Sequence, residues 1–369
     1  MKLDKVKLLL TFDYELPMGS CSNYNKGVFT PSEKILEVAE DFNVPVVLFA
    51  DICSAQMFKD WDYEGFYLPF KKQLHTALKL NHDVQLHIHP HWLLSEFKDS
   101  NYIPSPKLGL NEYVHENPPL NISGIIENAV NEMVNICKEV KPDYQCIAYR
   151  AGCYSIQPTT DKIFQALYQQ GIRIDSSVVR GLFWKTEALS VDYRQVFQKS
   201  GWTVNLQGEL DKEANEGLFE VPVTTMPAFI GNRLTRIKKK LLNKEKYRQL
   251  KYDDAGSGFS GPPTNSRKYK IMNAIHSPFV LSFDNMTTDV NLIDQIIAYN
   301  LKKYKDTENL ILCANSHPKC FGVHQFQLFK DSIKLIQDKY GDVIEFTTFD
   351  QIYQQGAFGQ SRTKNRGYF

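Results

Sequence analysis

Apolar and polar positions along this chain follow two periods, and their order predicts strands that alternate with helices. Residues 6–12 form a short apolar run that ends at Asp13, which is typical of a buried strand. From Thr30 onward apolar side chains recur every three or four positions, as on the buried face of a helix, and Thr30 to Glu33 resembles a capping box. Further strands are expected over residues 45–50, 83–89, 146–149, 172–174, 310–314 and 343–347. Further helices are expected around residues 74–78 and over 123–137, 160–170, 292–304, 325–340 and 349–354.

The strand-then-helix order implies a parallel sheet, either open or closed into a barrel. Seven or eight strands favour closure, so the predicted fold class is α/β, a distorted (β/α)7-type barrel. Two stretches, 93–122 and 231–270, have the composition of insertions, and the second begins with a basic run and ends in glycine and proline. The polar residues 356–369 are expected to form a flexible tail.

Polar residues with catalytic potential follow the predicted strands. Asp13, the histidines of 87–91, Arg150, Asp175 and His317 all lie just beyond an apolar run. In parallel α/β folds the carboxyl ends of the strands meet at one edge, and chemistry collects there. These residues are therefore expected to lie together.

Three of the nine histidines fall within five residues, at His87, His89 and His91. An extended backbone places residues i, i+2 and i+4 on one face, so the three imidazoles could converge. Converging neutral imidazoles are ligands for a divalent transition metal. Polar alternation on a surface strand is the alternative, but apolar Leu86 and Ile88 on the other face favour a metal site.

Composition narrows the cellular context. The formal net charge of +1 gives no reason to expect nucleic acid or another polyanion as a partner. Seven cysteines without a Cys-x-x-Cys pair suit reduced thiols. The first apolar run ends too early for a secretion signal, and no stretch of 18 apolar residues predicts a membrane span. A cytoplasmic location is therefore expected, while the oligomeric state is not predicted.

The residues at the strand ends, taken together, resemble motifs of the polysaccharide deacetylase family, also called carbohydrate esterase family 4. The resemblance extends from Thr11 to about Pro318, and the motifs occur in the order of the family. It is most similar to the branch of cell-wall and surface-polysaccharide deacetylases. The phrases that carry it are Phe12-Asp13-Tyr14-Glu15, Gln85-Leu86-His87-Ile88-His89-Pro90, Tyr149-Arg150-Ala151-Gly152 and Ser316-His317-Pro318-Lys319.

The resemblance implies roles for the first two motifs. Asp13 matches the general base, while Tyr14 stands where most members have an aspartate that binds metal. Glu15, two residues after the base, is then the expected ligand, although it could also be a solvated loop carboxylate. In the second motif His87 and His91 match the spacing His-x-x-x-His, and His87 and His89 offer a His-x-His alternative. Two histidines and one carboxylate would leave positions open on a catalytic Zn²⁺ or another divalent transition metal.

The remaining motifs imply the rest of the machinery. Arg150 matches the arginine that pairs with the base, and His317 matches the general acid. Asp175 matches the acidic residue that orients the catalytic histidine, with a capping or turn role as the alternative. Trp92 and Tyr154 lie beside motif residues and could stack on a sugar, or they could belong to the core.

The resemblance predicts a single catalytic domain over 1–355 with the insertions named above. Its expected activity is metal-dependent removal of acetyl groups from a polysaccharide or glycan precursor, with N-deacetylation first. The expected enzyme class is a hydrolase of non-peptide carbon–nitrogen bonds, and its partner is an acetylated saccharide. Two alternatives remain open: hydrolysis of another amide or of a glycosidic bond on the same fold, and an inactive glycan-binding homologue, which Tyr14 suggests.

Overall fold

The computed structural model describes residues 6–17, 23–98, 101–186, 189–228 and 266–356, together with residues 234, 238, 241 and 242. Most of the expected insertion at 231–270 and the expected tail beyond residue 356 lie outside the described residues. The longer strands are β1 (Val6–Tyr14), β2 (Val47–Asp51), β3 (Asp83–Ile88), β6 (Ala148–Ala151), β14 (Ile311–Ser316) and β15 (Ile344–Thr347). The shorter strands are β4 (Glu96–Lys98), β5 (Asn101–Ile103), β7 (Ile174–Asp175), β8 (Phe183–Lys185), β9 (Ser190–Asp192), β10 (Trp202–Val204), β11 (Leu218–Glu220), β12 (Thr225–Met226) and β13 (Phe279–Val280).

Nine of the described strands form one sheet in the order β10-β11-β7-β6-β3-β2-β1-β14, with β15 paired to the first half of β1. All neighbouring pairs in it are parallel except β10 with β11. Beyond β11, the backbone N–H of Thr224 donates to the carbonyl of Cys313 on β14 at 2.8 Å. This bond joins the segment after β11 to β14 at the other side of the sheet, so the sheet curls into a distorted barrel. The predicted fold class is confirmed.

The two faces of the sheet bury different sets of residues. Leu8, Leu10 and Phe12 of β1 belong to the large outer core, which includes residues of the surrounding helices. Leu9 belongs to a smaller inner cluster, whose members are contributed by the other strands and by the last helix: Val47, Phe49, Ile147, Ala148, Ile174, Val221, Ile311, Cys313, Phe349 and Ile352. Because side chains alternate along a strand, the inner row of β1 continues from Leu9 to Thr11, Asp13 and Glu15. The barrel interior is thus apolar at the amino ends of the strands and polar at their carboxyl ends.

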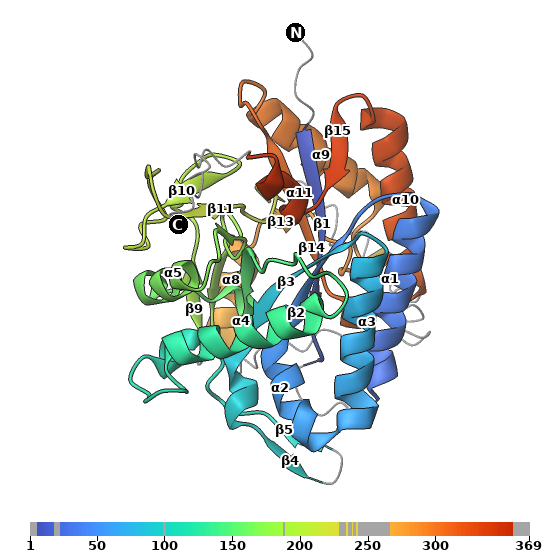
Figure 1. Ribbon diagram of the computed structural model, residues 1–369. Coiled ribbons are helices and arrows are strands. Elements are labelled where there is room, and N and C mark those ends of the chain that lie inside the picture. Colours follow the sequence, from blue (N-terminus) through green and yellow to red (C-terminus); the bar gives the residue numbers. More distant parts are fainter. Residues whose placement is uncertain are drawn as a thin grey trace, which may run out of the picture.

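Helices pack around the sheet, with β1 near the centre of the view in Figure 1. Their bounds are α1 (Thr30–Asp41), α2 (Ile52–Trp61), α3 (Leu68–Lys79), α4 (Ile122–Lys138), α5 (Thr160–Gln169), α8 (Arg267–His276), α9 (Val290–Lys303), α10 (Val323–Tyr340) and α11 (Phe349–Gln354). Phe349 of α11 packs edge-on against Phe49 at 5.5 Å between ring centroids, so α11 covers the apolar end of the interior. None of the described helices combines the length and the apolar character needed to cross a bilayer.

Each predicted strand and helix has a counterpart, with ends that differ by a few residues. The capping box at Thr30 is wrong, because a π-helical segment, Asn25–Phe29, runs directly into α1 and no side chain caps that helix. The helix α2 was not predicted. Part of the expected insertion at 93–122 folds as the β4–β5 hairpin, which extends beyond α2 in Figure 1.

Candidate active site

The carboxyl ends of β1, β3, β6 and β14 bring distant polar residues to one place. The register of the sheet aligns Thr11 with Asn315 of β14, and His87 with Arg150 of β6. The strands β1, β3 and β14 each continue their inward row by one residue beyond the strand end, to Glu15, His89 and His317. Since the strands are parallel, all of these groups lie at the same edge of the barrel.

Asp13 and Arg150 form a fully buried ion pair at the centre of this edge. Nη1 of Arg150 lies 2.8 Å from Oδ1 of Asp13, and the Arg150 side chain is 0% exposed. The guanidinium also donates to Thr11, Asn315 and the carbonyl of Ser176, at 2.7–2.9 Å, and lies 4.2 Å above the Phe49 ring. Burial alone would raise the pKa of Asp13, but Arg150, helped by His87 and His317, lowers it below its usual value. The Asp13 carboxylate is therefore ionised and fixed in direction.

The second oxygen of Asp13 is held from another side. Asn315 donates from Nδ2 to Oδ2 of Asp13 at 3.1 Å, and Nδ2 also contacts the hydroxyl of Tyr154 at 2.7 Å. Nε2 of His317 lies 3.5 Å from the same Oδ2. Asp13 thus has one oxygen bound to Arg150 and one directed toward His317.

Glu15 faces the two imidazoles of His87 and His89. Its Oε2 lies 2.5 Å from Nε2 of His89 and 3.7 Å from Nε2 of His87. The other oxygen, Oε1, lies 3.0 Å from Nζ of Lys319 and 3.5 Å from Nε2 of His317. Burial would raise the pKa of Glu15, but Lys319 and the two histidines lower it well below the usual value. Glu15 is therefore a buried carboxylate rather than a solvated one, since it is 6% exposed.

The ring nitrogens of this cluster are arranged as metal ligands would be. Nδ1 of His87 donates to the carbonyl of Arg150 at 2.8 Å, which directs Nε2 toward Glu15. Nε2 of His87 and Nε2 of His89 both face Oε2 of Glu15, and Nδ1 of His89 has no hydrogen-bond partner within the described residues. Buried ring nitrogens without partners are costly, and a bound cation would satisfy them. Donor atoms of Glu15, His87 and His89 lie within 4.8 Å of one another, so these residues fit a divalent metal ion.

The local backbone explains why His89 joins this cluster. Asp51, at the end of β2, accepts from the backbone N–H of His89 at 3.2 Å and from Nε1 of Trp92 at 2.6 Å. On the other side, a Cβ on Gly152 would lie 2.7 Å from Nδ1 of His89. A residue other than glycine at 152 would therefore displace the imidazole.

His91 is not part of the group that could hold the metal. The extended backbone ends at His89 because Pro90 begins a 3-10 turn, Pro90–Leu94. The ring of His91 packs on Trp92 at 5.0 Å between centroids, and burial lowers the pKa of His91 to about 3. Of the two spacings that the sequence offered, the geometry matches His87 with His89.

His317 is paired with a carboxylate that the sequence did not indicate. Its Nδ1 donates to Oδ2 of Asp284 at 2.7 Å, and its backbone N–H donates to Oδ1 of Asp284 at 2.8 Å. Burial would lower the pKa of His317, but Asp284, Asp13 and Glu15 raise it above its usual value. A protonated imidazole with Nε2 directed at the site can donate a proton.

The expected orienting role of Asp175 is therefore wrong. Asp175 lies on β7, where Oδ1 accepts from the hydroxyl of Ser177 at 2.7 Å and Oδ2 from its backbone N–H. Burial raises the pKa of Asp175. The side chain that holds Nδ1 of His317 comes from the segment between β13 and α9 instead.

The two aromatic residues expected at the substrate differ in their positions. Trp92 is 1% exposed and packs on Tyr102 at 4.2 Å between centroids, so stacking on a sugar is excluded and Trp92 belongs to the core. Tyr154 is half-buried and reaches the site through Asn315. Cys153 and Tyr154 both have a left-handed backbone, with φ of 55° and 56°. Such strain in residues other than glycine is found most often at functional sites.

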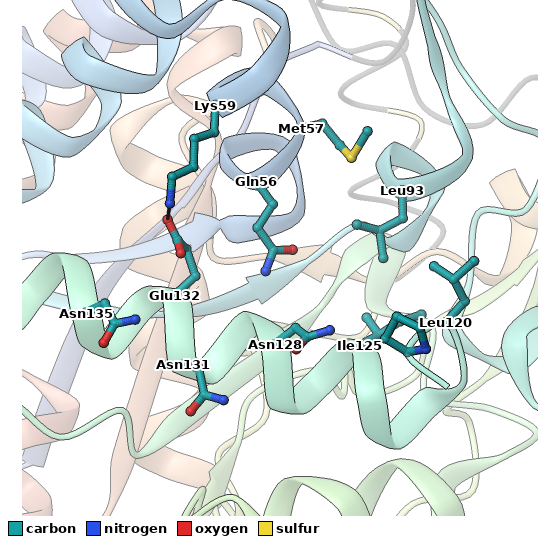
Figure 2. Close-up of a pocket in the computed structure, with 11 residues that line it drawn as sticks. Gln56, Met57, Lys59, Leu93, Leu120, Ile125, Asn128, Asn131, Glu132 and Asn135 are labelled. Atoms are coloured by element: carbon teal, nitrogen blue, oxygen red, sulfur yellow. Dashed lines mark hydrogen bonds and ion pairs between the residues drawn. The ribbon is translucent and has the colours of Figure 1, made fainter. Parts of the chain in front are cut away.

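A separate pocket lies on the outside of the barrel, between α2 and α4. Its volume is about 500 Å³, and Figure 2 shows Lys59 and Glu132 paired across it. Amide side chains of Gln56, Asn128, Asn131 and Asn135 line it together with apolar residues such as Leu93. None of the residues of the carboxylate and imidazole cluster lines this pocket.

Comparison with known proteins gives structural likeness without sequence likeness. No family model matches the chain, and no curated protein matches its sequence. A structure described as a polysaccharide deacetylase of Mycobacterium smegmatis is similar, with 11% identity over 99% of this chain and 95% of that one and a TM-score of 0.48. An allantoinase has 10% identity over 96% of this chain and 92% of that chain, with a TM-score of 0.45. A 4-alpha-glucanotransferase of Thermococcus litoralis has 12% identity over 96% of this chain and 41% of that chain, with a TM-score of 0.45.

Several further similar structures are deacetylases of polysaccharide or peptidoglycan, the class that the sequence motifs resemble. Across the similar structures the identities are 7–12% and the TM-scores are 0.27–0.48.

Sequence reasoning missed Asp51, Asp284, Asn315 and Lys319. Asp51 follows a predicted strand, so the rule that nominated Asp13 could have found it. Asn315 lies two residues before His317 and Lys319 two residues after it, and the same inward alternation could have indicated Asn315. Asp284 follows no predicted strand and carries no comparable signal.

Proposed function

We propose that this protein is a metal-dependent hydrolase that removes acetyl groups from a saccharide, with an N-acetyl group as the first candidate. The observation that carries the proposal is the position of the Asp13 carboxylate. It is ionised by Arg150 and lies 3.5 Å from a histidine paired to a carboxylate, beside a cluster suited to a cation. Amide hydrolysis needs a base for water, a charge near the carbonyl oxygen and an acid for the leaving nitrogen, and these groups can supply all three.

Glu15, His87 and His89 would hold the metal, and Zn²⁺ is the first candidate because two imidazoles and a carboxylate match its catalytic ligand sets. When bound, such an ion polarises a carbonyl oxygen and lowers the pKa of a water molecule. Asp13 accepts the proton of the attacking water through the oxygen that Arg150 does not occupy. Arg150 and Asn315 keep that carboxylate in place during the reaction.

His317 is the acid that protonates the departing amine. Asp284 accepts the proton of Nδ1 in a hydrogen bond and favours the charged form of the ring, which raises the pKa of His317. Proton donation from Nε2 leaves acetate and a free amine as products. Tyr154, held by Asn315, stands at the same edge and is the candidate for contact with the sugar.

The alternatives predict different results. Cleavage of a glycosidic bond needs two carboxylates that flank the bond. Here Asp13 is held by Arg150 and Glu15 by Lys319, both buried cations, and Asp284 is paired with His317. This pairing favours amide chemistry. The same geometry would serve a different non-peptide amide, and an assay of product release distinguishes the two substrate classes.

The test is acetate release from a panel of N- and O-acetylated saccharides, with the protein loaded with zinc and then treated with a chelator. We expect release that stops with the chelator and returns with added metal. Absence of acetate from the whole panel, with metal bound, would contradict the proposal and favour the glycan-binding alternative. Release of an amine from a non-acetyl amide would favour hydrolysis of another amide on the same fold.

A further inference from the structure

Lys319 is a buried lysine inside the proposed metal site. It belongs to the 3-10 turn Pro318–Cys320 that follows β14, and it is 3% exposed. Its Nζ lies 3.0 Å from Oε1 of Glu15. Lysine is rarely buried without a partner because removal of its charge from water is costly. The carboxylate that stabilises Lys319 is the one proposed to bind metal.

The two oxygens of Glu15 serve different partners. Oε2 faces Nε2 of His89 at 2.5 Å, while Oε1 faces Lys319. A carboxylate held in this way offers a cation one oxygen rather than two. Lys319 therefore restricts both the charge and the number of donor atoms that Glu15 can give.

Two carboxylates at this edge, Asp13 and Glu15, already have cationic partners without a metal. Asp13 is paired with Arg150 and Glu15 with Lys319, so two buried negative charges meet two buried positive ones. The ammonium of Lys319 lies 3.0 Å from the carboxylate that would bind the metal. A divalent cation that enters would meet repulsion from this ammonium, and charges in a buried site are weakly screened.

We propose that Lys319 competes with the divalent cation for Glu15 and so keeps metal binding weak and exchangeable. The inference rests on the metal site of the proposed function, and it assigns to Lys319 a role in setting metal affinity rather than in the reaction. The ammonium acts as a built-in cation that balances Glu15 while metal is absent. Metal occupancy then depends on the free metal concentration.

The experiment compares Lys319→Met, which removes the charge at similar volume, with Lys319→Arg, which keeps the charge. Lys334→Met on the exposed face of α10 is the matched control. The dissociation constants for zinc and cobalt are measured on the full chain at neutral pH by competition with a chromophoric chelator. We expect Lys319→Met to bind about tenfold more tightly or better. Lys319→Arg and Lys334→Met should stay within a few-fold of the natural protein.

Lys319→Gln keeps a hydrogen-bond donor without the charge, and it provides the same comparison if Lys319→Met does not fold. Equal or weaker metal binding by the uncharged variants would overturn the inference and leave the proposed metal site standing. If neither the natural protein nor these variants bind zinc or cobalt, the inference and the metal part of the proposed function both fail. The inference is supported if the uncharged variants bind zinc or cobalt more tightly than the natural protein and Lys319→Arg does not.

Discussion

Nδ1 of His317 donates a hydrogen bond to Oδ2 of Asp284 at 2.7 Å, and this pair connects the segment after β13 to the end of β14. The carboxylate has two consequences for the imidazole: it fixes the tautomer, and it favours the charged form. Nε2 is then the only ring nitrogen of His317 that can face Asp13 and Glu15, at 3.5 Å from each. An imidazole so arranged is suited to give a proton to a leaving group rather than to bind the metal.

The first prediction concerns Asp284→Asn. Because Asp284 raises the pKa of His317, its loss should lower that pKa. The protonated imidazole is present below its pKa and is lost as the pH rises through it, so the alkaline limb of the rate profile should move to lower pH. We expect kcat to fall roughly 10- to 100-fold at neutral pH. Profiles of kcat for both proteins measure this, and an alkaline limb that does not move would refute the role of His317.

The second prediction concerns Asp13→Asn. The asparagine keeps the size of the side chain and one acceptor for Arg150 but cannot accept the proton of water. Turnover should fall by about 10²-fold or more while metal content stays near that of the natural protein. Acetate release and elemental analysis on the same sample measure both quantities. If the variant loses its metal and excess zinc restores its activity, Asp13 is a metal ligand. The roles of base and ligand assigned to Asp13 and Glu15 are then exchanged.

The third prediction uses the histidine run itself as an internal control. Removal of either imidazole that faces Glu15, by His87→Ala or His89→Ala, should reduce zinc content from about one ion per chain to well below half, because an open site has few ligands to spare. His91→Ala should leave the content unchanged, since that ring packs on Trp92. Loss of metal in the His91 variant, with retention in the His89 variant, would reverse the ligand assignment.

The fourth prediction tests the fold rather than the site. His82 is 4% exposed, its Nδ1 accepts from the backbone N–H of Val46 at 3.3 Å, and burial lowers its pKa to about 4. An unfolded histidine has a pKa of about 6.5, so between these values the unfolded chain binds more protons and stability falls as the pH falls. Above about pH 6.5 the neutral His82 costs the folded protein no stability. By pH 4.5 the free energy of unfolding should be about 2 kcal/mol lower, because the unfolded histidine is protonated.

The variant His82→Asn keeps an acceptor near Val46 but cannot bind the proton. Urea unfolding at several pH values should show that the natural protein loses more stability between pH 7 and pH 4.5 than the variant does. At pH 8 neither side chain is charged, so protonation of His82 should contribute nothing to the difference in stability between the natural protein and the variant. Parallel pH profiles would contradict the account of His82.

Much of the fold could be predicted because the main strands are buried on both faces. The largely apolar residues of β1 and β2 predict buried segments, and helices such as α4 have one clear apolar stripe. The strands β10 and β11 were missed because each has three residues, too few to establish a period. The helix α2 was missed because its whole first turn is buried, and polar residues that are not buried begin only at Gln56.

The site could be predicted in part for a related reason. Apolar runs precede four of the site residues: Asp13, His87, Arg150 and His317. Because the strands are parallel, these residues lie at one edge of the barrel. The limit is set by residues whose role depends on contacts between distant segments. Asp284 reaches His317 across 33 positions of sequence from a loop, and Trp92 enters the core because Asp51 accepts its indole N–H. Neither contact has a local pattern.

The most direct test of the account is the position of a zinc ion in crystals of the natural protein, located by anomalous diffraction at the zinc edge. We predict one strong peak about 2.0–2.2 Å from Nε2 of His87, Nε2 of His89 and Oε2 of Glu15, with Asp13 beside it and not bound to it. A peak at His91, or at the group formed by Asp284, His317 and Cys320, with none at Glu15, would contradict the account.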